Sequence, residues 1–255
     1  MQKEQFIENA TGIGLDTNHK RSELVEIFEN IDKNIICEHS PSDAYYQAEY
    51  ILRNQKLEGP IVEFGCYKGG MSCKLSHLAE MLGKKYMMFD SFEGLPFDAT
   101  YECYDKNLAF LGKFYKNQFS CSLTECQINL QKYGMFFVCE FIAGKIEDTL
   151  PNFNIKPSHI FIDVDIIETA KFIIENIYEK KNCKTIFTHE ACLIDYVNEL
   201  TDDGWWKNVI KKPKPIRGTS LQQIPHGLLN AGCLDCYIEP DEDLDFQKII
   251  RETKP

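Results

Sequence analysis

A cluster of glycines beside two carboxylates is the first feature of this sequence that could do chemistry. Gly65, Gly69 and Gly70 follow the strand-like run PIVEFG and precede the helix-like run MSCKLSHLAEML. Glycine has no Cβ, so a turn built from it can approach a ligand closely. The spacing E-x-G-x-x-x-G-G differs from the G-x-G-x-x-G pattern of dinucleotide-binding turns. A glycine turn that only joins a strand to a helix remains an open interpretation at this point.

Glu63 and Asp90 place negative charge on both sides of this turn. Asp90 ends the next strand-like run, KYMMFD, where a carboxylate can accept hydrogen bonds from the hydroxyls of an adenosine ribose. Two carboxylates would repel a pyrophosphate, whereas they would attract the sulfonium and amino groups of S-adenosylmethionine. The pattern therefore favours S-adenosylmethionine over a nicotinamide dinucleotide.

A second set of chemically capable residues consists of Asp163, His189 and Glu190, which follow the strand-like runs HIFID and TIFT. One hypothesis is a metal site, in which the imidazole favours manganese, iron or zinc over magnesium. A second is a metal-free general base, since an ordinary imidazole accepts a proton near neutral pH. The third is a hydrogen-bonded histidine at a strand end, and the residues alone leave all three open.

Short apolar runs that alternate with helical segments predict how these residues are positioned. The runs PIVEFG, KYMMFD, FFVCEFIAG, HIFIDVD and TIFTHE are separated by helical patterns such as 70–83, 121–133 and 166–180. Strands that alternate with helices form βαβ units, which predicts a doubly wound, mostly parallel α/β sheet with helices on both faces. Ligands of such sheets bind at the carboxyl ends of the strands, where both sets of residues fall.

Residues 1–40 have a different pattern and are predicted to form an N-terminal helical extension. Apolar residues at 24, 25, 27, 28 and 31 form a helical stripe, and Ser40-Pro41 is typical of the start of a helix that runs to about Gln55. We assign residues 41–255 to an S-adenosylmethionine-binding domain. Because the extension lies outside the predicted sheet, its helices are expected to need a surface to pack on.

Composition excludes several classes of protein. The net charge of −11 argues against binding to a nucleic-acid backbone. No run of eighteen apolar residues and no signal-peptide core is present, so neither a membrane span nor secretion is expected. Eleven cysteines, an odd number, are typical of reduced thiols, and the pair Cys233 and Cys236 has no second pair at zinc spacing. We expect a cytoplasmic protein that acts on a small molecule.

Four segments of the sequence resemble a known family. VEFGCYKGGMS, FDSFEGLP, AGKIEDTLP and IFIDVDIIETAK follow one another in the order and spacing of the macrocin O-methyltransferase (TylF-like) family, over roughly residues 40–200. FDSFEGLP and the G-x-x-x-DTLP pattern are far more specific than any single glycine motif. The resemblance implies a class I, Rossmann-like methyltransferase fold that uses S-adenosylmethionine.

The resemblance also implies the cofactor's position. It places Glu63, Gly65 and Gly69 near the methionine part, Asp90 on the ribose, and the turn Ala143-Gly144 near the adenine. With their neighbours, the predicted cofactor-binding residues are Glu63, Gly65, Cys66, Tyr67, Gly69, Gly70, Asp90, Ser91, Phe92, Ala143, Gly144 and Asp163.

A divalent metal, usually magnesium, and a homo-oligomer, here a dimer, are further implications of the resemblance. In the family, one ligand is the first aspartate of the D-x-D strand end, here Asp163, and the others are an acidic pair after the next strand. This chain has His189-Glu190 in place of Asp-Asp, and Ile167 in place of a tyrosine. We therefore predict Asp163, His189 and Glu190 as ligands of magnesium or manganese.

The predicted reaction is direct transfer of a methyl group to a hydroxyl, which requires alignment of oxygen, methyl carbon and sulfur and removal of the acceptor proton. Asp163 and His189 are the predicted catalytic residues, and the resemblance implies a sugar hydroxyl or a related natural-product intermediate as acceptor. Transfer to nitrogen, a nicotinamide-dependent oxidoreductase and a catalytically silent cofactor-binding protein remain alternatives.

Asp165 and Glu168 are expected to stabilise a helix start, where the helix dipole favours carboxylates. Tyr46 and Tyr50 are expected to pack in the core.

Overall fold

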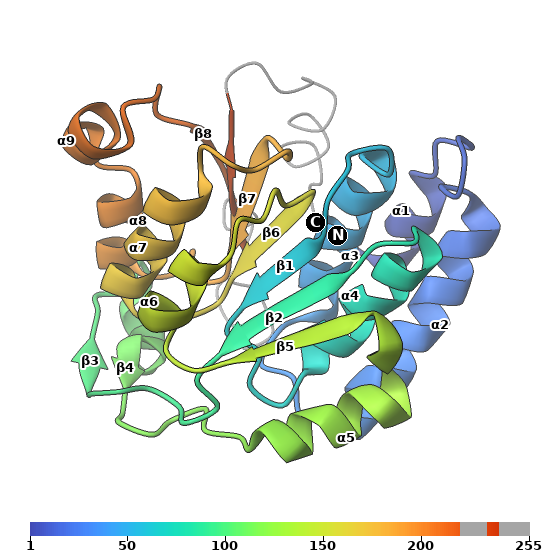
Figure 1. The fold of residues 1–255 in the computed structure, drawn as a ribbon, viewed down its shortest axis with the longest axis horizontal. Coiled ribbons are helices and arrows are strands. Elements are labelled where there is room, and N and C mark those ends of the chain that lie inside the picture. Colours follow the sequence, from blue (N-terminus) through green and yellow to red (C-terminus); the bar gives the residue numbers. More distant parts are fainter. Residues whose placement is uncertain (220–233, 240–255) are drawn as a thin grey trace.

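A seven-stranded sheet forms the centre of the computed structural model, which describes residues 1–219 and 234–239 (Figure 1). The strand order is β5-β2-β1-β6-β7-β9-β8. The first five strands in this order are parallel, while β9 and β8 form an antiparallel edge. Their bounds are β5 (Cys139–Ala143), β2 (Tyr86–Asp90), β1 (Ile61–Phe64), β6 (His159–Ile162), β7 (Thr185–Thr188), β9 (Asp235–Ile238) and β8 (Ile216–Thr219). The predicted mostly parallel α/β sheet is confirmed.

Helices cover both faces of this sheet (Figure 1). One face carries α1 (Lys3–Glu8), α2 (Asn18–Asn34), α3 (Pro41–Arg53), α4 (Gly70–Met81) and α5 (Leu123–Tyr133). The other carries α6 (Ile146–Thr149), α7 (Ile167–Ile177) and α8 (Ile194–Leu200). Shorter helical turns are η1 (Lys106–Gly112), η2 (Phe136–Val138), η3 (Leu150–Asn152), α9 (Asp203–Trp205) and η4 (Trp206–Ile210). Among the described residues, no helix combines the length and apolar character needed to cross a membrane.

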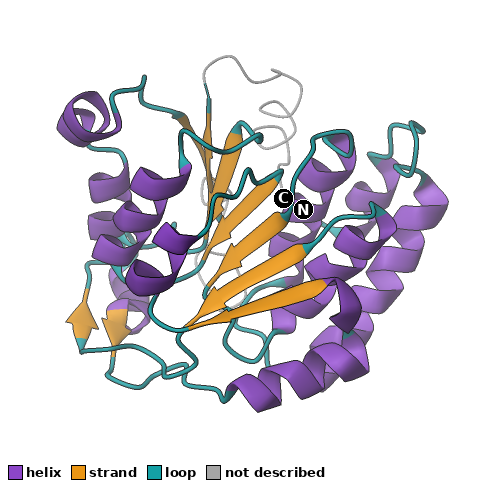
Figure 2. Ribbon diagram, viewed as in Figure 1, coloured by secondary structure: helices purple, strands orange, loops and turns teal. Residues whose placement is uncertain are grey.

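The chain changes direction across the sheet between β1 and β6. From β1 it moves outward to β2 and β5, and it then returns to β6 on the other side of β1. Such a switch point opens a crevice at the carboxyl ends of the strands. Figure 2 shows the strand ends converging there, with the small hairpin of β3 (Ala99–Thr100) and β4 (Lys113–Phe114) beside them.

Local capping determines where the helices begin. α5 starts at Leu123, two residues later than predicted, because the Ser122 hydroxyl accepts a hydrogen bond from the Glu125 amide at 3.1 Å. α3 starts at Pro41 as predicted, and the Ser40 amide donates to the Asp43 carboxylate at 2.9 Å. The predicted packing of Tyr46 and Tyr50 in the core is also confirmed.

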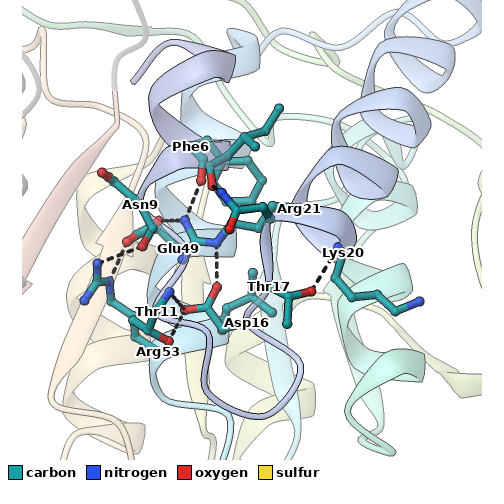
Figure 3. A network of polar contacts seen from close by, with 12 residues as sticks. Phe6, Asn9, Thr11, Asp16, Thr17, Lys20, Arg21, Glu49 and Arg53 are labelled. Carbon is teal, nitrogen blue, oxygen red and sulfur yellow. Dashed lines mark hydrogen bonds and ion pairs between the residues drawn. The ribbon is translucent and has the colours of Figure 1, made fainter.

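The N-terminal helices pack on the chain's own core. Of the predicted stripe, Leu24, Val25, Phe28 and Ile31 are buried in one continuous apolar cluster with the sheet. Beneath it, the fully buried Arg21 pairs with Asp16 (2.5 Å) and with Glu49 of α3 (Figure 3). The extension therefore finds its packing surface within the chain and does not require a second subunit for that purpose. The boundary at residue 40 remains a prediction.

Candidate active site

One cavity of about 1320 Å³ lies at the carboxyl ends of β1, β2, β6 and β7. Single drug-sized ligands occupy pockets of about 300–1,000 Å³, so this volume can hold a cofactor and an acceptor together. Of the residues predicted from sequence, the cavity wall contains Gly65, Cys66, Tyr67, Gly70, Asp90, Ser91, Asp163, His189 and Glu190. Glu63, Gly69, Phe92, Ala143 and Gly144 are not part of that wall, although the residues that follow the Ala143-Gly144 turn are.

Asp90 holds the glycine turn through its carboxylate. One oxygen accepts hydrogen bonds from the amides of Cys66 (2.6 Å) and Tyr67 (3.0 Å), and the other accepts one from the Phe92 amide (2.7 Å). Burial raises the pKa of Asp90, and these three hydrogen bonds oppose that rise. A carboxylate has about four acceptor positions, so one remains for a ligand hydroxyl.

Glu63 lies beneath the glycine turn. Its side chain is fully buried and accepts hydrogen bonds from the hydroxyls of Ser72 and Tyr86, the latter at 2.8 Å. Burial raises its pKa to about 7, even though both hydroxyls favour the ionised form. Glu63 therefore supplies negative charge, or a proton, from below the turn.

The glycines are required by protein contacts as well as by any ligand. Gly65 has φ +84°, and a Cβ at this position would overlap the carbonyl oxygen of Asp163. A Cβ on Gly70 would lie 2.8 Å from the Cβ of Cys37. At the turn, therefore, β1 lies close to the end of β6 and to the segment that precedes α3.

Asp163 lies between two histidines. His39 Nε2 is 2.8 Å from Asp163 Oδ2, and His189 Nδ1 is 3.4 Å from Asp163 Oδ1. His189 Nδ1 is also 3.5 Å from Glu190 Oε1. The predicted residues Asp163, His189 and Glu190 are therefore brought together, and His39 joins them from the segment between α2 and α3.

These groups strongly perturb one another's protonation. Burial lowers the pKa of His39, but the charge of Asp163, the nearby Cys37 and the hydrogen bond to Asp163 together outweigh burial and raise that pKa to about 10. The pKa of His189 likewise rises well above its ordinary value, because Asp163 and Glu190 outweigh burial. Burial raises the pKa of Asp163, but the two imidazoles hold it well below the usual range. The raised pKa values favour the charged form of each ring, and a protonated imidazole donates hydrogen bonds but cannot accept a proton.

Asp165 also belongs to the site, although its position in the sequence predicted that it would stabilise a helix start. The helix cap is instead Ile166, and Asp165 adopts φ +57°, an unusual conformation for a residue with a side chain. Asp165 belongs to the cavity wall, and a carboxylate oxygen of its side chain lies within 4.8 Å of those of Asp163 and Glu190. Burial, then the charges of Glu190 and Asp163, raise the pKa of Asp165 well above its ordinary value.

Two sets of three side chains have the spacing of metal ligands among the described residues. The first is His39, Asp163 and His189, and the second is Asp163, Asp165 and Glu190. The donor atoms within each set lie within 4.8 Å of one another. No local motif indicated His39, whereas the D-x-D spacing of Asp163 and Asp165 was a visible signal for the second set.

Comparisons with known proteins identify the family to which the chain is similar and the solved structures that share its fold. The family model described as macrocin-O-methyltransferase (TylF) matches residues 44–188, more than half of the chain. Among solved structures, the O-methyltransferase NovP superposes with a TM-score of 0.51 at 16% identity, covering 93% of this chain and 88% of NovP. The calicheamicin methyltransferase CalS11 gives 0.50 at 14% identity, covering 94% and 90%. The cofactor-bound protein Rv0187 from MTB gives 0.50 at 12%, covering 92% and 94%.

These structural likenesses show the shared fold, and a sequence search of curated proteins finds no match. The family match, by contrast, spans the glycine turn, Asp90 and Asp163. The chain belongs to the macrocin-O-methyltransferase (TylF) family of S-adenosylmethionine-dependent O-methyltransferases.

Proposed function

We propose that this enzyme methylates a hydroxyl of a sugar-containing or related natural-product molecule, with Asp163 and His189 at the acceptor oxygen. The observation that carries the proposal is that one cavity contains both the glycine turn with Asp90 and the Asp163–His189 cluster. The cofactor and the acceptor can therefore meet within a single cavity, as direct methyl transfer requires.

The cofactor half of the proposal assigns the methionine part to the glycine turn and the ribose to Asp90. Asp90 is supported by its free acceptor position and by its rigid attachment to the turn. The carboxylate of Asp90 favours a sulfonium over a pyrophosphate, which weighs against the nicotinamide-dependent alternative.

The acceptor half lies beside the segment between β2 and α5. Leu95, Phe97, Leu111 and Phe114 give this part of the cavity an apolar wall, and Lys116 adds a cationic group. Phe97 is 48% exposed and Leu111 is 37% exposed, so apolar surface remains available for a bound molecule. An acceptor with both an apolar body and hydroxyl groups, such as a glycoside, suits these walls.

A divalent metal fits the donor atoms around Asp163. Residues His39, Asp163 and His189 would hold it, with Glu190 and Asp165 close by. A metal ion bound there supplies charge that stabilises a deprotonated acceptor oxygen. The protein's own contribution is to hold the acceptor at the strand ends, with Asp163 fixed between the two imidazoles, and to exclude water from the methyl group.

Activity can be tested by following S-adenosylhomocysteine formation with a panel of glycosides, nucleotide-linked sugars and matched amines. Turnover with hydroxyl acceptors, and not with amines, is expected. His189→Ala should lower the rate by about 10²–10⁴, the scale of assisted proton removal, because it removes a ligand of the metal ion that would stabilise the deprotonated acceptor oxygen, while S-adenosylhomocysteine affinity stays unchanged. His19→Ala is the matched control, because His19 is 80% exposed and outside the cavity.

Several results would contradict the proposal. A fully active His189→Ala enzyme would remove His189 from the reaction. Stabilisation against heating by NAD and not by S-adenosylhomocysteine would favour an oxidoreductase. Binding of S-adenosylhomocysteine without turnover of any acceptor would favour a catalytically silent protein.

The cellular setting forms a separate part of the proposal. A homodimer is supported by the family resemblance alone, since the N-terminal helices pack within the chain. Light scattering that returns the monomer mass of 29.5 kDa at all concentrations would contradict the dimer.

The cysteine-rich composition supports a reducing compartment, the cytoplasm. Cys233, one of the C-x-x-C pair, lies outside the described residues.

A further inference from the structure

The site contains one potential ligand that neither the sequence motifs nor the family match includes. His39 Nε2, Asp163 and His189 Nδ1 converge from three separate segments of the chain, with 2.8 Å and 3.4 Å between the rings and Asp163. We propose that His39 completes a site of two histidines and one carboxylate that selects a first-row transition-metal ion, such as manganese, iron or zinc, over magnesium. The inference rests on the proposed function, since it concerns the same cavity.

The arrangement of the ring nitrogens supports ligation. Each oxygen of Asp163 faces a different ring, and one donor atom from each of the three residues lies within 4.8 Å of the other two. The second nitrogen of each ring faces another partner: His39 Nδ1 lies 3.4 Å from the thiol of Cys37, and His189 Nε2 lies 3.9 Å from the buried carboxylate of Asp43. Metal-binding histidines characteristically have their second nitrogen oriented by such a partner.

Packing fixes the two rings before any ion binds. The His39 and His189 rings stack edge to face with centroids 4.5 Å apart, and His39 also contacts Phe161 of β6. Their side chains are 9% and 14% exposed. Little side-chain entropy is therefore lost on ligation, which favours a site that is already formed.

The donor types determine which ion is selected. Magnesium prefers an octahedral set of oxygen ligands and retains several waters, whereas imidazole suits manganese, iron, cobalt and zinc. The competing all-oxygen set, Asp163 with Asp165 and Glu190, would suit magnesium. The two sets share only Asp163, so an ion held by both imidazoles takes the carboxylate away from the all-oxygen set.

The proposed preference for a transition-metal ion over magnesium depends on two histidines that the family match does not include. The match covers residues 44–188, which include Asp163, while His39 precedes it and His189 directly follows it. The family's acidic pair is therefore not a guide to the ion here, because His189 stands in place of its first aspartate and His39 lies outside the matched residues.

The test is direct ion binding to the chelator-treated full-length protein, measured by calorimetry with Mn²⁺, Zn²⁺ and Mg²⁺ added alone. Wild type is expected to bind Mn²⁺ and Zn²⁺ at least about tenfold more tightly than Mg²⁺. His39→Asn should lose about tenfold or more in Mn²⁺ and Zn²⁺ affinity. His39→Asp should shift the preference toward Mg²⁺, and the exposed-residue control His19→Asn should behave as wild type.

A measurement on wild type alone keeps the inference testable if the His39 variants do not fold. Pulsed electron paramagnetic resonance of the Mn²⁺-loaded protein should show nitrogen couplings from two imidazoles. Couplings from one imidazole or none, equal affinity for Mg²⁺ and Mn²⁺, no ion binding, or an unchanged Mn²⁺ affinity in folded His39→Asn would each overturn the proposal. S-adenosylhomocysteine binding is measured on the same samples, so failure of the metal site is distinguished from failure of the proposed function.

Discussion

Asp90 and Asp163 occupy equivalent places on either side of β1, at the ends of β2 and β6, yet they are held in opposite ways. Three backbone amides bind the oxygens of Asp90, and all three lie within 24 residues of it in sequence. The oxygens of Asp163 face the side chains of His39 and His189, of which the first is 124 residues away. The cofactor half of the cavity is therefore built from backbone, and the acceptor half from side chains.

Because the two carboxylates are held by different groups, their pKa values shift in opposite directions. Amides are neutral dipoles, and for Asp90 burial outweighs them, so its pKa is raised. Two imidazoles can carry full positive charge, and for Asp163 they outweigh burial, so its pKa is lowered. A single substitution can change the charge of the acceptor half, whereas the backbone dipoles of the cofactor half persist through most substitutions.

The largest expected effect comes from Gly65→Ala, because Gly65 joins the two halves. An alanine at position 65 would have to adopt the left-handed backbone conformation of Gly65, and its Cβ would overlap the Asp163 carbonyl oxygen. The left-handed conformation costs about 1–2 kcal/mol and overpacking about 1–3 kcal/mol, so the free energy of unfolding should fall by about 3 kcal/mol. Urea denaturation measures this change.

Gly83→Ala is the matched control for that prediction. Gly83 also has a positive φ, +64°, but a Cβ there would meet no atom within 4 Å. It should cost only the conformational part, about 1–2 kcal/mol. Equal losses in the two variants would mean that the contact between the turn and Asp163 contributes nothing to stability.

The contrast between the halves also explains what the sequence could predict. The sheet, the helices and the Asp90 turn follow from local patterns, because apolar periodicity, glycine positions and capping residues act over a few residues. The start of α5 is also set locally, because the Ser122 side chain caps the helix two residues after the predicted start. His39 could not be predicted, because its role depends on how the segment before α3 meets a strand more than a hundred residues later. Asp165 was visible in the sequence but misassigned, since only the observed backbone shows that Ile166 caps the helix.

A smaller effect is expected from Asp90→Ala, which tests the cofactor half. Loss of the ribose contact should weaken S-adenosylmethionine binding by about 1.5–3 kcal/mol, the scale of a hydrogen bond to a charged group. The amides of Cys66, Tyr67 and Phe92 would also lose their acceptor, so the unfolding free energy should fall by about 1–3 kcal/mol. Calorimetry and urea denaturation report the two quantities separately.

Asp148→Ala is the control for Asp90, because Asp148 is an exposed carboxylate in the same cavity wall. It should leave both quantities nearly unchanged. Unaltered S-adenosylmethionine affinity in a folded Asp90→Ala protein would show that Asp90 only braces the turn, and the ribose would then have to bind elsewhere.

The smallest expected effect concerns Glu63, the buried carboxyl beneath the turn, and it appears as a pH dependence. Its pKa is raised from 4.5 to about 7 by burial, so between these values the folded protein binds a proton that the unfolded chain has lost. The stability that Glu63 contributes is therefore complete below pH 4.5 and is lost as pH rises through 7. From pH 6 to pH 8, wild type should lose about 1 kcal/mol of unfolding free energy relative to Glu63→Gln, whose amide oxygen can still accept from Ser72 and Tyr86.

Urea denaturation of both proteins at pH 6 and pH 8 measures this difference, and Glu80→Gln, an exposed glutamate on α4, is the control that should track wild type. Parallel pH profiles for wild type and Glu63→Gln would mean that Glu63 titrates as an ordinary carboxyl group. Saturating S-adenosylhomocysteine adds a second comparison. If the cofactor's amino group lies above Glu63, its positive charge favours the ionised carboxylate and the pH-dependent difference should shrink. An undiminished difference with the cofactor bound would place that amino group away from Glu63, and the charge of the cofactor half would then come from Asp90 alone.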